Sequence, residues 1–345
     1  MVEVLKVFEF IPEAKDLFIK RYRVLEGVKN SGGIGRRLLS IKLELTERVI
    51  RDEVEKLKKL GFINVTNLGM NITDKGELFL EDMNDIYSEL IILPKSEIQL
   101  GKLLNLDKVI VIKGNTTSNE DALKDLGAIA SKYFVSTLRD DMVISVTGGS
   151  TILAMANSTK TDKSFSNIMV VPARGGIGNF VEEQSNSIAS KFAEALGGEF
   201  KPLYLPDDLD SKMIDVMMHN QNIREFYELL GSIDILVFGI GRADIMARKR
   251  ELDAETTNMI LENGAVAESF GHYFDIDGEE VYHHSTIGIS MDCVKSIPKL
   301  IAVAGSSIKA EAIIAVSKIR SDMTLIIDEN AAMKIIELYN ENGGV

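Results

Sequence analysis

From residue 107 onward the chain alternates short apolar runs with longer amphipathic segments. The runs, such as Val109–Lys113 and Ile235–Ile240, are strand-sized and carry few polar residues. Strands of this kind are typical of a parallel sheet that helices cover on both faces. The pattern therefore predicts an α/β domain with a large doubly wound parallel sheet over residues 91–345. The predicted strands are Val109–Lys113, Val143–Thr147, Ile168–Pro172, Leu203–Leu205, Ile235–Ile240, Leu300–Ala304 and Leu325–Asp328. The helices predicted between and after them include Glu120–Leu138, Glu182–Leu196, Ile223–Leu230, Lys309–Lys318 and Asn330–Glu341.

Residues 1–90 show a helical period that is followed by a short alternating pattern. Apolar residues recur at helical spacing behind Thr46, which is a good N-cap, and continue to Leu60. A shorter helix is predicted before this one, at Ile34–Leu43, and a small hairpin after it, within residues 62–73. The order of helix, turn, helix and hairpin predicts a winged helix-turn-helix domain.

A further helix is predicted from Asp74 to about Leu90, ahead of Pro94. It carries an apolar stripe although it lies between the two predicted domains. The stripe favours either a linker helix that pairs between subunits or a helix that packs on its own domain.

Charge is distributed unevenly along the chain. The formal net charge is −13, but residues 15–60 carry a local charge of +6 and the remainder carries −19. Such asymmetry favours a basic module that contacts a polyanion and is carried on an acidic body. Chance clustering of lysine and arginine on solvated helix faces is the alternative.

The basic segment coincides with the winged helix-turn-helix pattern, which predicts a DNA-binding surface. The second helix of such a pair lies in the major groove, and arginine suits guanine because its fork matches the O6 and N7 acceptors. Two arginines stand three residues apart near the start of that helix, and two more begin the preceding helix, where they are expected to face phosphates. Each of them singly could also be solvated surface charge. The expected contacts with double-stranded operator DNA are Arg36, Arg37, Thr46, Arg48 and Arg51.

A glycine-rich turn follows one predicted strand of the sheet. Val143–Thr147 runs into Gly148, Gly149, Ser150 and Thr151, and a helix comes next. Glycines let the backbone approach a ligand closely, and a helix start offers free N–H groups and a positive dipole end. The turn matches neither a Walker loop nor a dinucleotide-binding fingerprint. It predicts an anion cradle, with a tight turn that holds no ligand as the alternative.

Cations come after the ends of three other predicted strands. They are Arg174, then Arg242 with the run Arg248, Lys249 and Arg250, and Lys309. Ligands of open α/β sheets bind at the carboxyl ends of the strands, so these side chains are expected near the glycine-rich turn. Because charge-assisted hydrogen bonds from arginine and lysine to phosphate are strong, the arrangement predicts a phosphorylated ligand.

Few residues suggest catalysis. The four histidines lack metal-ligand spacing, the single cysteine has no partner, and no GxSxG motif is present. No catalytic residue, metal or cofactor is therefore expected. Glu268 and the pair Asp275 and Asp277 are carboxylates near a predicted strand, and they could assist acid–base work on a sugar or bind its hydroxyls.

The chain shows no sign of secretion or membrane insertion. A lone cysteine fits a reducing compartment. The N-terminus lacks a signal-peptide pattern, and no apolar run approaches the roughly 18 residues that span a bilayer. A cytoplasmic protein without a membrane partner is expected.

Five stretches of the chain resemble the SorC/DeoR-type sugar-responsive transcriptional regulators. They are IGRRLLSIKLELTERVIRDEVEKLKKLG, VTGGSTI, VVPARGGIG, AVAESFGHYFDIDGEEV and IAVAGSSIKAEAI. The resemblance implies a winged-helix head on a sugar-phosphate-isomerase-like body that has become a sensor. It also implies a homo-oligomer, dimer or tetramer, that represses a glycolytic operon and has fructose 1,6-bisphosphate as its inducer. Residues 1–90 would then be the DNA-binding domain with its linker helix, and residues 91–345 the effector-binding and oligomerisation domain.

The resemblance also implies which residues bind the effector. One phosphate would lie on the glycine-rich turn, two cations would hold phosphate, a carboxylate would meet sugar hydroxyls, and a final lysine would close the site. The implied residues are Gly148, Gly149, Ser150, Thr151, Arg174, Gln184, Lys249, Arg250, Glu268 and Lys309.

The chain departs from the family pattern at three places. Lys249 stands where an arginine is expected, and lysine keeps the charge but loses the bidentate fork. Ser306, Ser307 and Ile308 stand where Gly-Ser-Ser is expected. The isomerase and deaminase relatives carry Asp-Gly-His where this chain has residues 241–244, GRAD, which argues against turnover.

Three functions stay open at this point. A ligand-controlled transcription factor is favoured by the basic segment and by the missing Asp-Gly-His. The alternatives are a sugar-phosphate isomerase or deaminase-type enzyme with an accessory N-terminal domain, and a scaffold that uses the winged helix to bind proteins. The operator sequence, the exact phosphosugar and the direction of control are left open.

Overall fold

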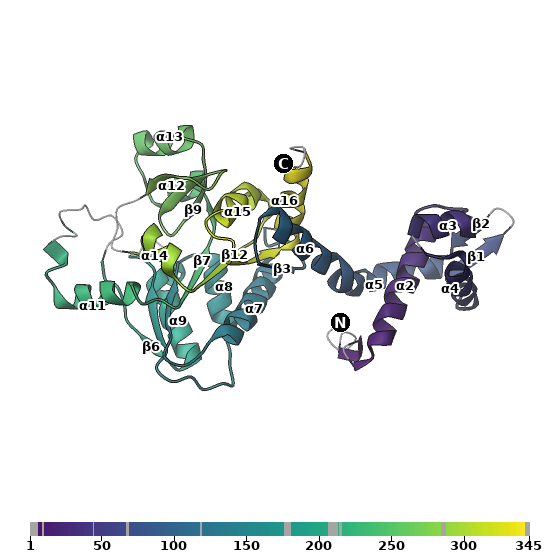
Figure 1. Ribbon diagram of the computed structural model, residues 1–345, viewed down its shortest axis with the longest axis horizontal. Helices are drawn as coiled ribbons and strands as arrows, with labels where there is room; N and C mark the ends of the chain where they lie inside the picture. Colours follow the sequence, from purple (N-terminus) through teal and green to yellow (C-terminus); the bar gives the residue numbers. More distant parts are fainter. Residues whose placement is uncertain are drawn as a thin grey trace. The chain divides into compact units, whose positions relative to one another are not determined.

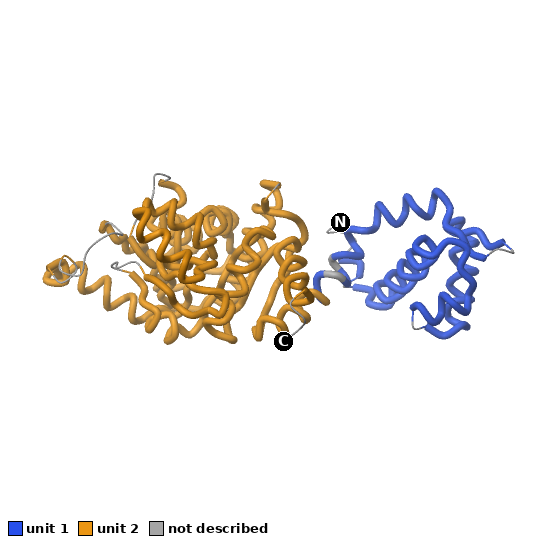
Figure 2. Tube along the Cα trace, turned by 90° about the horizontal axis from the view of Figure 1, so that it is seen from above, with its two compact units in different colours: residues 1–94 blue, residues 95–345 orange. Residues whose placement is uncertain are grey.

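The computed structural model describes residues 6–341 apart from 9, 44, 67–68, 118, 176–180, 206–212, 214–215 and 284–287. The chain divides into two compact units, Met1–Pro94 and Lys95–Val345 (Figure 2). Each unit has its own hydrophobic core.

The first unit is a winged helix-turn-helix, as the sequence predicts (Figure 1). The long helix α4 begins behind Thr46, whose hydroxyl accepts a hydrogen bond from Val49 N at 3.4 Å. Its apolar stripe is buried in the core of the unit, and its opposite face is exposed. The elements are α2 (Pro12–Lys29), α3 (Arg36–Leu43), α4 (Glu47–Lys59), β1 (Ile63–Thr66), β2 (Gly69–Ile72) and α5 (Asp74–Tyr87).

The β1–β2 hairpin is anchored to the turn that precedes α3. Ile34 forms a β-bridge with Met70, which ties the hairpin to the helical part of the unit. Gly69 has φ +115°, and a Cβ at this position would lie 2.0 Å from the carbonyl oxygen of Gly33. Only glycine fits at this close approach, because no side chain tolerates either the backbone conformation or the contact.

A buried carboxylate joins the first two long helices of this unit. Glu53 on α4 is 2% exposed and accepts hydrogen bonds from Arg21 at 2.9 Å and Lys56 at 3.2 Å, and Lys20 lies 3.5 Å away. Burial raises the pKa of Glu53, but the hydrogen bonds from Arg21 and Lys56 outweigh it and hold the pKa below its usual value. Glu53 therefore stays ionised and fixes α2 against α4.

Helix α5 packs on its own unit, which was one of the two open alternatives. Its last residue, Tyr87, stacks on Tyr22 of α2 with ring centroids 4.0 Å apart. The helix was expected to end near Leu90, and α5 ends at Tyr87, but the chain stays helical beyond it. A π-helical turn at Ser88–Ile92 continues α5 directly into α6 (Leu93–Leu103), and Pro94, which has no N–H to donate, lies two residues after this turn.

The second unit is built on a seven-stranded sheet with the order β3-β13-β12-β7-β4-β5-β6, in which all neighbouring strands are parallel. Buried side chains point to both faces of it. Val237 lies in the core with helices α7 to α9, and its neighbours Leu236 and Phe238 on the other face are fully buried too. The strands are β3 (Lys108–Ile112), β4 (Val143–Val146), β5 (Met169–Pro172), β6 (Glu199–Phe200), β7 (Ile235–Gly239), β12 (Lys299–Ala304) and β13 (Thr324–Asp328). The main helices are α7 (Glu120–Thr137), α8 (Ser150–Ser158), α9 (Ser185–Leu196), α11 (Gln221–Leu230), α15 (Ala310–Ser317) and α16 (Glu329–Glu341).

One predicted strand, Leu203–Leu205, was wrong. The edge strand is β6 instead, and it ends at Phe200. The side chain of Asn186 replaces a neighbouring strand at Leu203, because its amide donates to the Leu203 carbonyl at 2.8 Å and its oxygen accepts from Leu203 N at 3.0 Å. The backbone of Leu203 is satisfied without a ladder.

The structure contains a second, smaller sheet that was not predicted from the sequence. It is antiparallel with the order β11-β10-β9-β8, and it lies with α12 and α13 beside the large sheet (Figure 1). Its own small core includes Ala247, Ile260 and Tyr273. The elements are β8 (Gly241–Arg242), α12 (Ala243–Lys249), α13 (Ala254–Glu262), β9 (Ala265–Ser269), β10 (His272–Asp275) and β11 (Glu280–His283).

The close contact between α7 and α8 at Gly127 allows a prediction about the stability of the second unit. A Cβ on Gly127 would lie 2.6 Å from the backbone carbon and oxygen of Ala154, so Gly127→Val forces the two helices apart. We expect a loss of about 1–3 kcal/mol in the free energy of unfolding of the second unit, measured by thermal unfolding followed with circular dichroism. Ala128→Val, on the exposed side of the same helix, is the matched control and should cost less than about 1 kcal/mol. Equal effects of the two substitutions would show that the close contact is not what matters.

Candidate functional site

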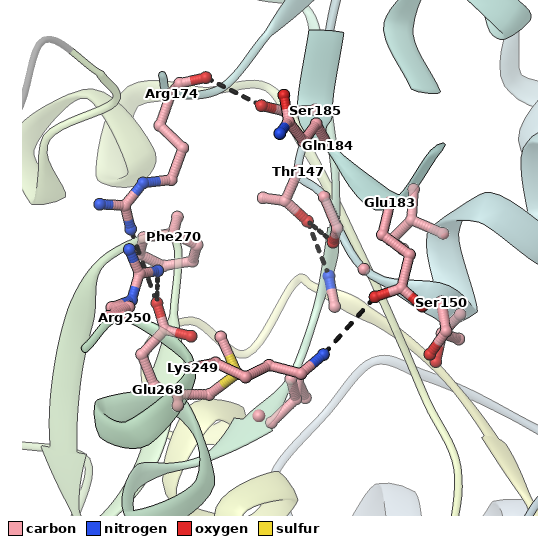
Figure 3. Close-up of a pocket in the computed structure, with 18 of the residues that line it drawn as sticks. Thr147, Ser150, Arg174, Glu183, Gln184, Ser185, Lys249, Arg250, Glu268 and Phe270 are labelled. Atoms are coloured by element: carbon pink, nitrogen blue, oxygen red, sulfur yellow. Dashed lines mark hydrogen bonds and ion pairs between the residues drawn. The ribbon is translucent and has the colours of Figure 1, made fainter. Parts of the chain in front are cut away.

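A cavity of about 360 Å³ lies at the carboxyl ends of β4, β5, β7 and β12 (Figure 3). The residues that the sequence singled out for the effector follow these four strands or lie on the elements beside them. All ten contribute to the wall of this one cavity, namely Gly148, Gly149, Ser150, Thr151, Arg174, Gln184, Lys249, Arg250, Glu268 and Lys309. The structure therefore brings the whole set together.

The glycine-rich turn forms one side of the cavity. Gly149 has φ +111° and occupies the N-cap position of α8, where it offers no side-chain cap to the helix start. Gly148 packs so tightly that a Cβ would lie 2.5 Å from the carbonyl oxygen of Glu183, and that carbonyl accepts from Gly149 N at 2.8 Å. The turn thus presents the N-terminus of α8, with its positive dipole end, to the cavity.

A buried cluster of charges forms the opposite side. Glu268 on β9 accepts a hydrogen bond from Arg250 at 2.5 Å and lies 3.6 Å from Arg174 (Figure 3). It also accepts from Gly271 N at 2.7 Å. The three charged side chains are each about 4% exposed. Glu268 therefore holds both guanidinium groups at the cavity wall, in addition to any contact with a ligand.

Lysines provide further positive charge. Lys249 lies 3.5 Å from Glu183 across the cavity, and this pair is partly exposed (Figure 3). Lys309 makes no ion pair with the carboxylates of the residues that the structure describes. Burial, together with the nearby charge of Lys249, lowers the pKa of Lys309, and Asp328 offsets this only in part. An anion in the cavity would relieve this unfavourable charge.

Asp328 holds the turn that carries Lys309, and the sequence did not point to it. Its carboxylate is fully buried and accepts from Ser306 N at 2.9 Å and from Thr116 Oγ1 at 2.7 Å. Ser306 has φ +90°, a strained conformation for a serine, which these contacts stabilise. The sequence places Asp328 at the end of a predicted strand, which is a common position for a functional residue. Which groups its carboxylate contacts depends on the tertiary fold.

Several other residues of the cavity were also missed. Thr147 accepts a hydrogen bond from Gly239 N at 3.1 Å and joins β4 to β7, while Phe270 belongs to the turn between β9 and β10. Ser185 donates to the carbonyl oxygen of Arg174 at 2.9 Å, which fixes the backbone from which that arginine extends (Figure 3). The residues concerned are Thr147, Ile152, Gly175, Glu183, Ser185, Gly239, Ile240, Gly241, Met246, Glu251 and Phe270. Arg248, which the sequence named beside Lys249 and Arg250, lines the cavity too.

The residues expected to contact DNA lie on the helix-turn-helix of the first unit. Arg48 and Arg51 are exposed on α4, and Arg37 is exposed on α3. Arg36 was expected to face phosphates, but in the structure it pairs with Glu55 at 3.3 Å. The Thr46 hydroxyl serves as the N-cap of α4. The exposed face of α4 therefore offers two arginines near its N-terminus that form no ion pair with the described residues.

Comparison with known proteins identifies the family. The model of the CggR N-terminal DNA-binding domain matches residues 17–87, and the sugar-binding domain model matches residues 89–337. The central glycolytic genes regulator of Bacillus subtilis is 34% identical over 328 residues, which cover 95% of this chain and 96% of that protein. The chain belongs to the central glycolytic genes regulator family. As a member, it is a transcriptional regulator and not an enzyme, so the isomerase or deaminase alternative is excluded.

Solved structures agree with this assignment. A SorC family transcriptional regulator from Enterococcus faecalis has a TM-score of 0.66 and 31% identity, and covers 70% of this chain and 99% of its own. The full-length sorbitol operon regulator SorC from Klebsiella pneumoniae has a TM-score of 0.66, and covers 88% of this chain and 94% of its own, but is only 17% identical and shows the fold alone. Among the described helices of the regulator, none is both long and apolar enough to cross a membrane.

The buried charge cluster makes a prediction about stability. Glu268→Gln removes the buried carboxylate that pairs with Arg174 and Arg250, and we expect a loss of about 3–5 kcal/mol in the free energy of unfolding. Inorganic phosphate should raise the melting temperature of this variant more than that of the wild type, because the anion replaces the missing charge. Thermal unfolding with and without phosphate measures both effects.

Glu183→Gln is the matched control, because it breaks a partly exposed ion pair of the same cavity. It should cost no more than about 1 kcal/mol. A cost as small for Glu268→Gln would contradict the stabilising role of the cluster.

Proposed function

We propose that this regulator represses a glycolytic operon and releases its operator when a phosphorylated sugar, fructose 1,6-bisphosphate, binds the cavity of the second unit. In this proposal residues 1–90 form the DNA-binding domain with its linker helix. Residues 91–345 form the effector-binding and oligomerisation domain of a dimer or tetramer. The observation that carries the proposal is the convergence of the helix α8 start and several cations on one cavity.

The charge of the cavity supports a multiply charged anion. Among the residues that the structure describes, five cations and three carboxylates line it, an excess of two positive charges in a chain whose net charge is −13. Its volume of about 360 Å³ lies in the range of small-molecule sites. A sugar bisphosphate offers one anion to the start of α8 and another to the lysines, and charge-assisted hydrogen bonds favour both.

The exposed face of α4 supports operator binding. In a winged helix-turn-helix the second helix enters the major groove with its N-terminal half, where Arg48 and Arg51 are exposed. Arginine at this place reads guanine and also adds to the attraction for phosphates. The basic segment at residues 15–60 carries this contact on an otherwise acidic protein.

Control of DNA binding requires a difference between two states. The effector changes operator affinity only if it binds the DNA-competent and the DNA-incompetent arrangements of the oligomer unequally. A coupling of about 1–3 kcal/mol is typical of such regulators. The direct test is a thermal-shift panel of phosphorylated sugars combined with an operator-binding titration. Fructose 1,6-bisphosphate should raise the melting temperature and weaken operator binding, and a panel in which no phosphosugar stabilises the protein would refute the proposal.

Two substitutions should separate the two activities. Arg51→Ala should cost about 1–3 kcal/mol of operator affinity and leave effector affinity unchanged, because the residue lies on the DNA-facing helix. Thr151→Ala should leave operator binding intact and abolish the response to the effector, because it removes a hydroxyl from the start of α8. Gel-shift titrations and calorimetry measure the two affinities.

The controls for this pair keep charge and chemistry comparable. Lys124→Ala removes an exposed cation from the second unit and should leave both affinities unchanged. Thr151→Ser keeps the hydroxyl and should keep the response. Loss of both activities in Arg51→Ala with the fold intact would argue against the division of labour between the units.

Effector binding should weaken as the pH rises through the pKa that Lys309 has in the free protein. Lys309 has a pKa below its ordinary value in the free protein, and a bound phosphate raises that pKa because it favours the charged ammonium. Affinity is therefore full below the free-state pKa, and between the free and the bound pKa binding takes up a proton. Calorimetry in two buffers of different ionisation enthalpy measures the uptake, which Lys309→Met should abolish. A wild type whose proton uptake equals that of Lys309→Met at every pH would exclude contact between Lys309 and the phosphate.

A further inference from the structure

Two histidines and a glutamate meet on the β10–β11 hairpin. His272 on β10 and His283 on β11 are direct partners across the strands, and their ring centroids lie 5.7 Å apart. Glu280 lies between the rings, with Oε2 3.0 Å from His272 Nδ1 and Oε1 2.7 Å from His283 Nδ1. One potential ligand atom from each residue lies within 4.8 Å of the other two.

A β-bulge creates this arrangement. Tyr273 pairs with Tyr282, whereas the next residue, Phe274, pairs with Glu280, so β11 contains one extra residue at this point. In a regular strand Glu280 and His283 would point to opposite faces, because they are three residues apart. The extra residue turns Glu280 to the face that carries the two histidines. This is why the spacing along the sequence did not suggest a metal site.

The three groups are the ligand types that zinc-class metals prefer. Two imidazole nitrogens and a carboxylate oxygen make a three-residue set that leaves one tetrahedral position for water. Both Nδ1 atoms face the carboxylate of Glu280, at 3.0 Å from His272 and 2.7 Å from His283. In the neutral tautomer that carries its proton on Nε2, each Nδ1 lone pair is available to a metal ion. A cation between the three groups would replace these hydrogen bonds by coordination.

The exposure of the three residues suits a site that takes its metal from solution. The side chain of His272 is 11% exposed, that of Glu280 29% and that of His283 60%. The site is thus anchored on its buried side and open on the other. We propose that His272, Glu280 and His283 bind a divalent transition metal of the zinc class, which clips β10 to β11. This inference does not depend on the proposed effector, since none of the three residues lines the cavity.

The clip would stiffen one wall of the effector cavity. His272 directly follows Gly271, whose N–H donates to Glu268 at 2.7 Å, and Glu268 holds the two buried arginines. A metal on His272 therefore fixes the strand that begins next to this contact. Because the metal binds only the folded hairpin, it should raise the melting temperature of the protein.

The test titrates the chelator-treated full-length protein with Co²⁺, whose visible absorption reports coordination by nitrogen and oxygen, and then with Zn²⁺ as competitor. We expect saturation at one metal per chain, displacement by Zn²⁺ and a rise in melting temperature. Glu280→Gln and His283→Ala should each weaken Co²⁺ binding by about tenfold or more. Both positions are partly exposed, so circular dichroism should show an unchanged fold.

His219→Ala is the matched control, because it removes an exposed histidine outside the hairpin. It should bind Co²⁺ with the affinity of the wild type. The proposal is overturned if the wild type shows no saturable cobalt absorption, or if Glu280→Gln and His283→Ala bind as tightly as the wild type. In either case the three residues form only a hydrogen-bonded cluster.

Discussion

Glu268 is the residue on which the cavity of the second unit depends. Burying two guanidinium groups costs several kcal/mol of lost hydration each, and only a buried counter-ion with good geometry offsets that cost. Glu268 supplies it, and the N–H of Gly271 completes its hydrogen bonds. Its position is set by the small antiparallel sheet, which places β9 beside the ends of the large sheet. The cavity can therefore hold cations near a ligand before any ligand arrives.

The first unit uses the same principle for another purpose. Glu53 is buried and collects Arg21, Lys20 and Lys56 around it, so that part of the basic segment serves the packing of α2 on α4. Arg48 and Arg51 are outside this network and are exposed on the same helix. The charge along the sequence does not show which cations pack α2 on α4 and which are exposed for DNA. The structure does, because the first group surrounds the buried carboxylate of Glu53.

The cavity of the second unit has one side built by the large parallel sheet and an opposite side built by the small antiparallel sheet and α12. The parallel sheet fixes the start of α8 and the turn at Ser306, where Asp328 stabilises a strained backbone. The opposite wall comes from the hairpins of the small sheet and from α12, which carry Glu268 and Lys249. A ligand that bridges the two walls would couple them, which is the physical basis for a sensor that changes the state of an oligomer. The proposed metal clip acts on the second wall.

The sequence by itself determined the winged helix and six of the seven strands of the large sheet, because helical and strand periods are local. It also brought the glycine-rich turn and the cations after the strand ends together, because parallel strands end at one edge of a sheet. The full set of ten effector residues, with Gln184 among them, came from the family resemblance. The tertiary structure alone decided the pairing of Glu268 with Arg174 and Arg250, the role of Asp328, and the meeting of His272 with Glu280 and His283. These depend on which strands lie side by side and on a bulge that changes the facing of one side chain. Strand adjacency and the bulge produce no periodic pattern of residues in the sequence, because both arise from contacts between segments that fold against each other.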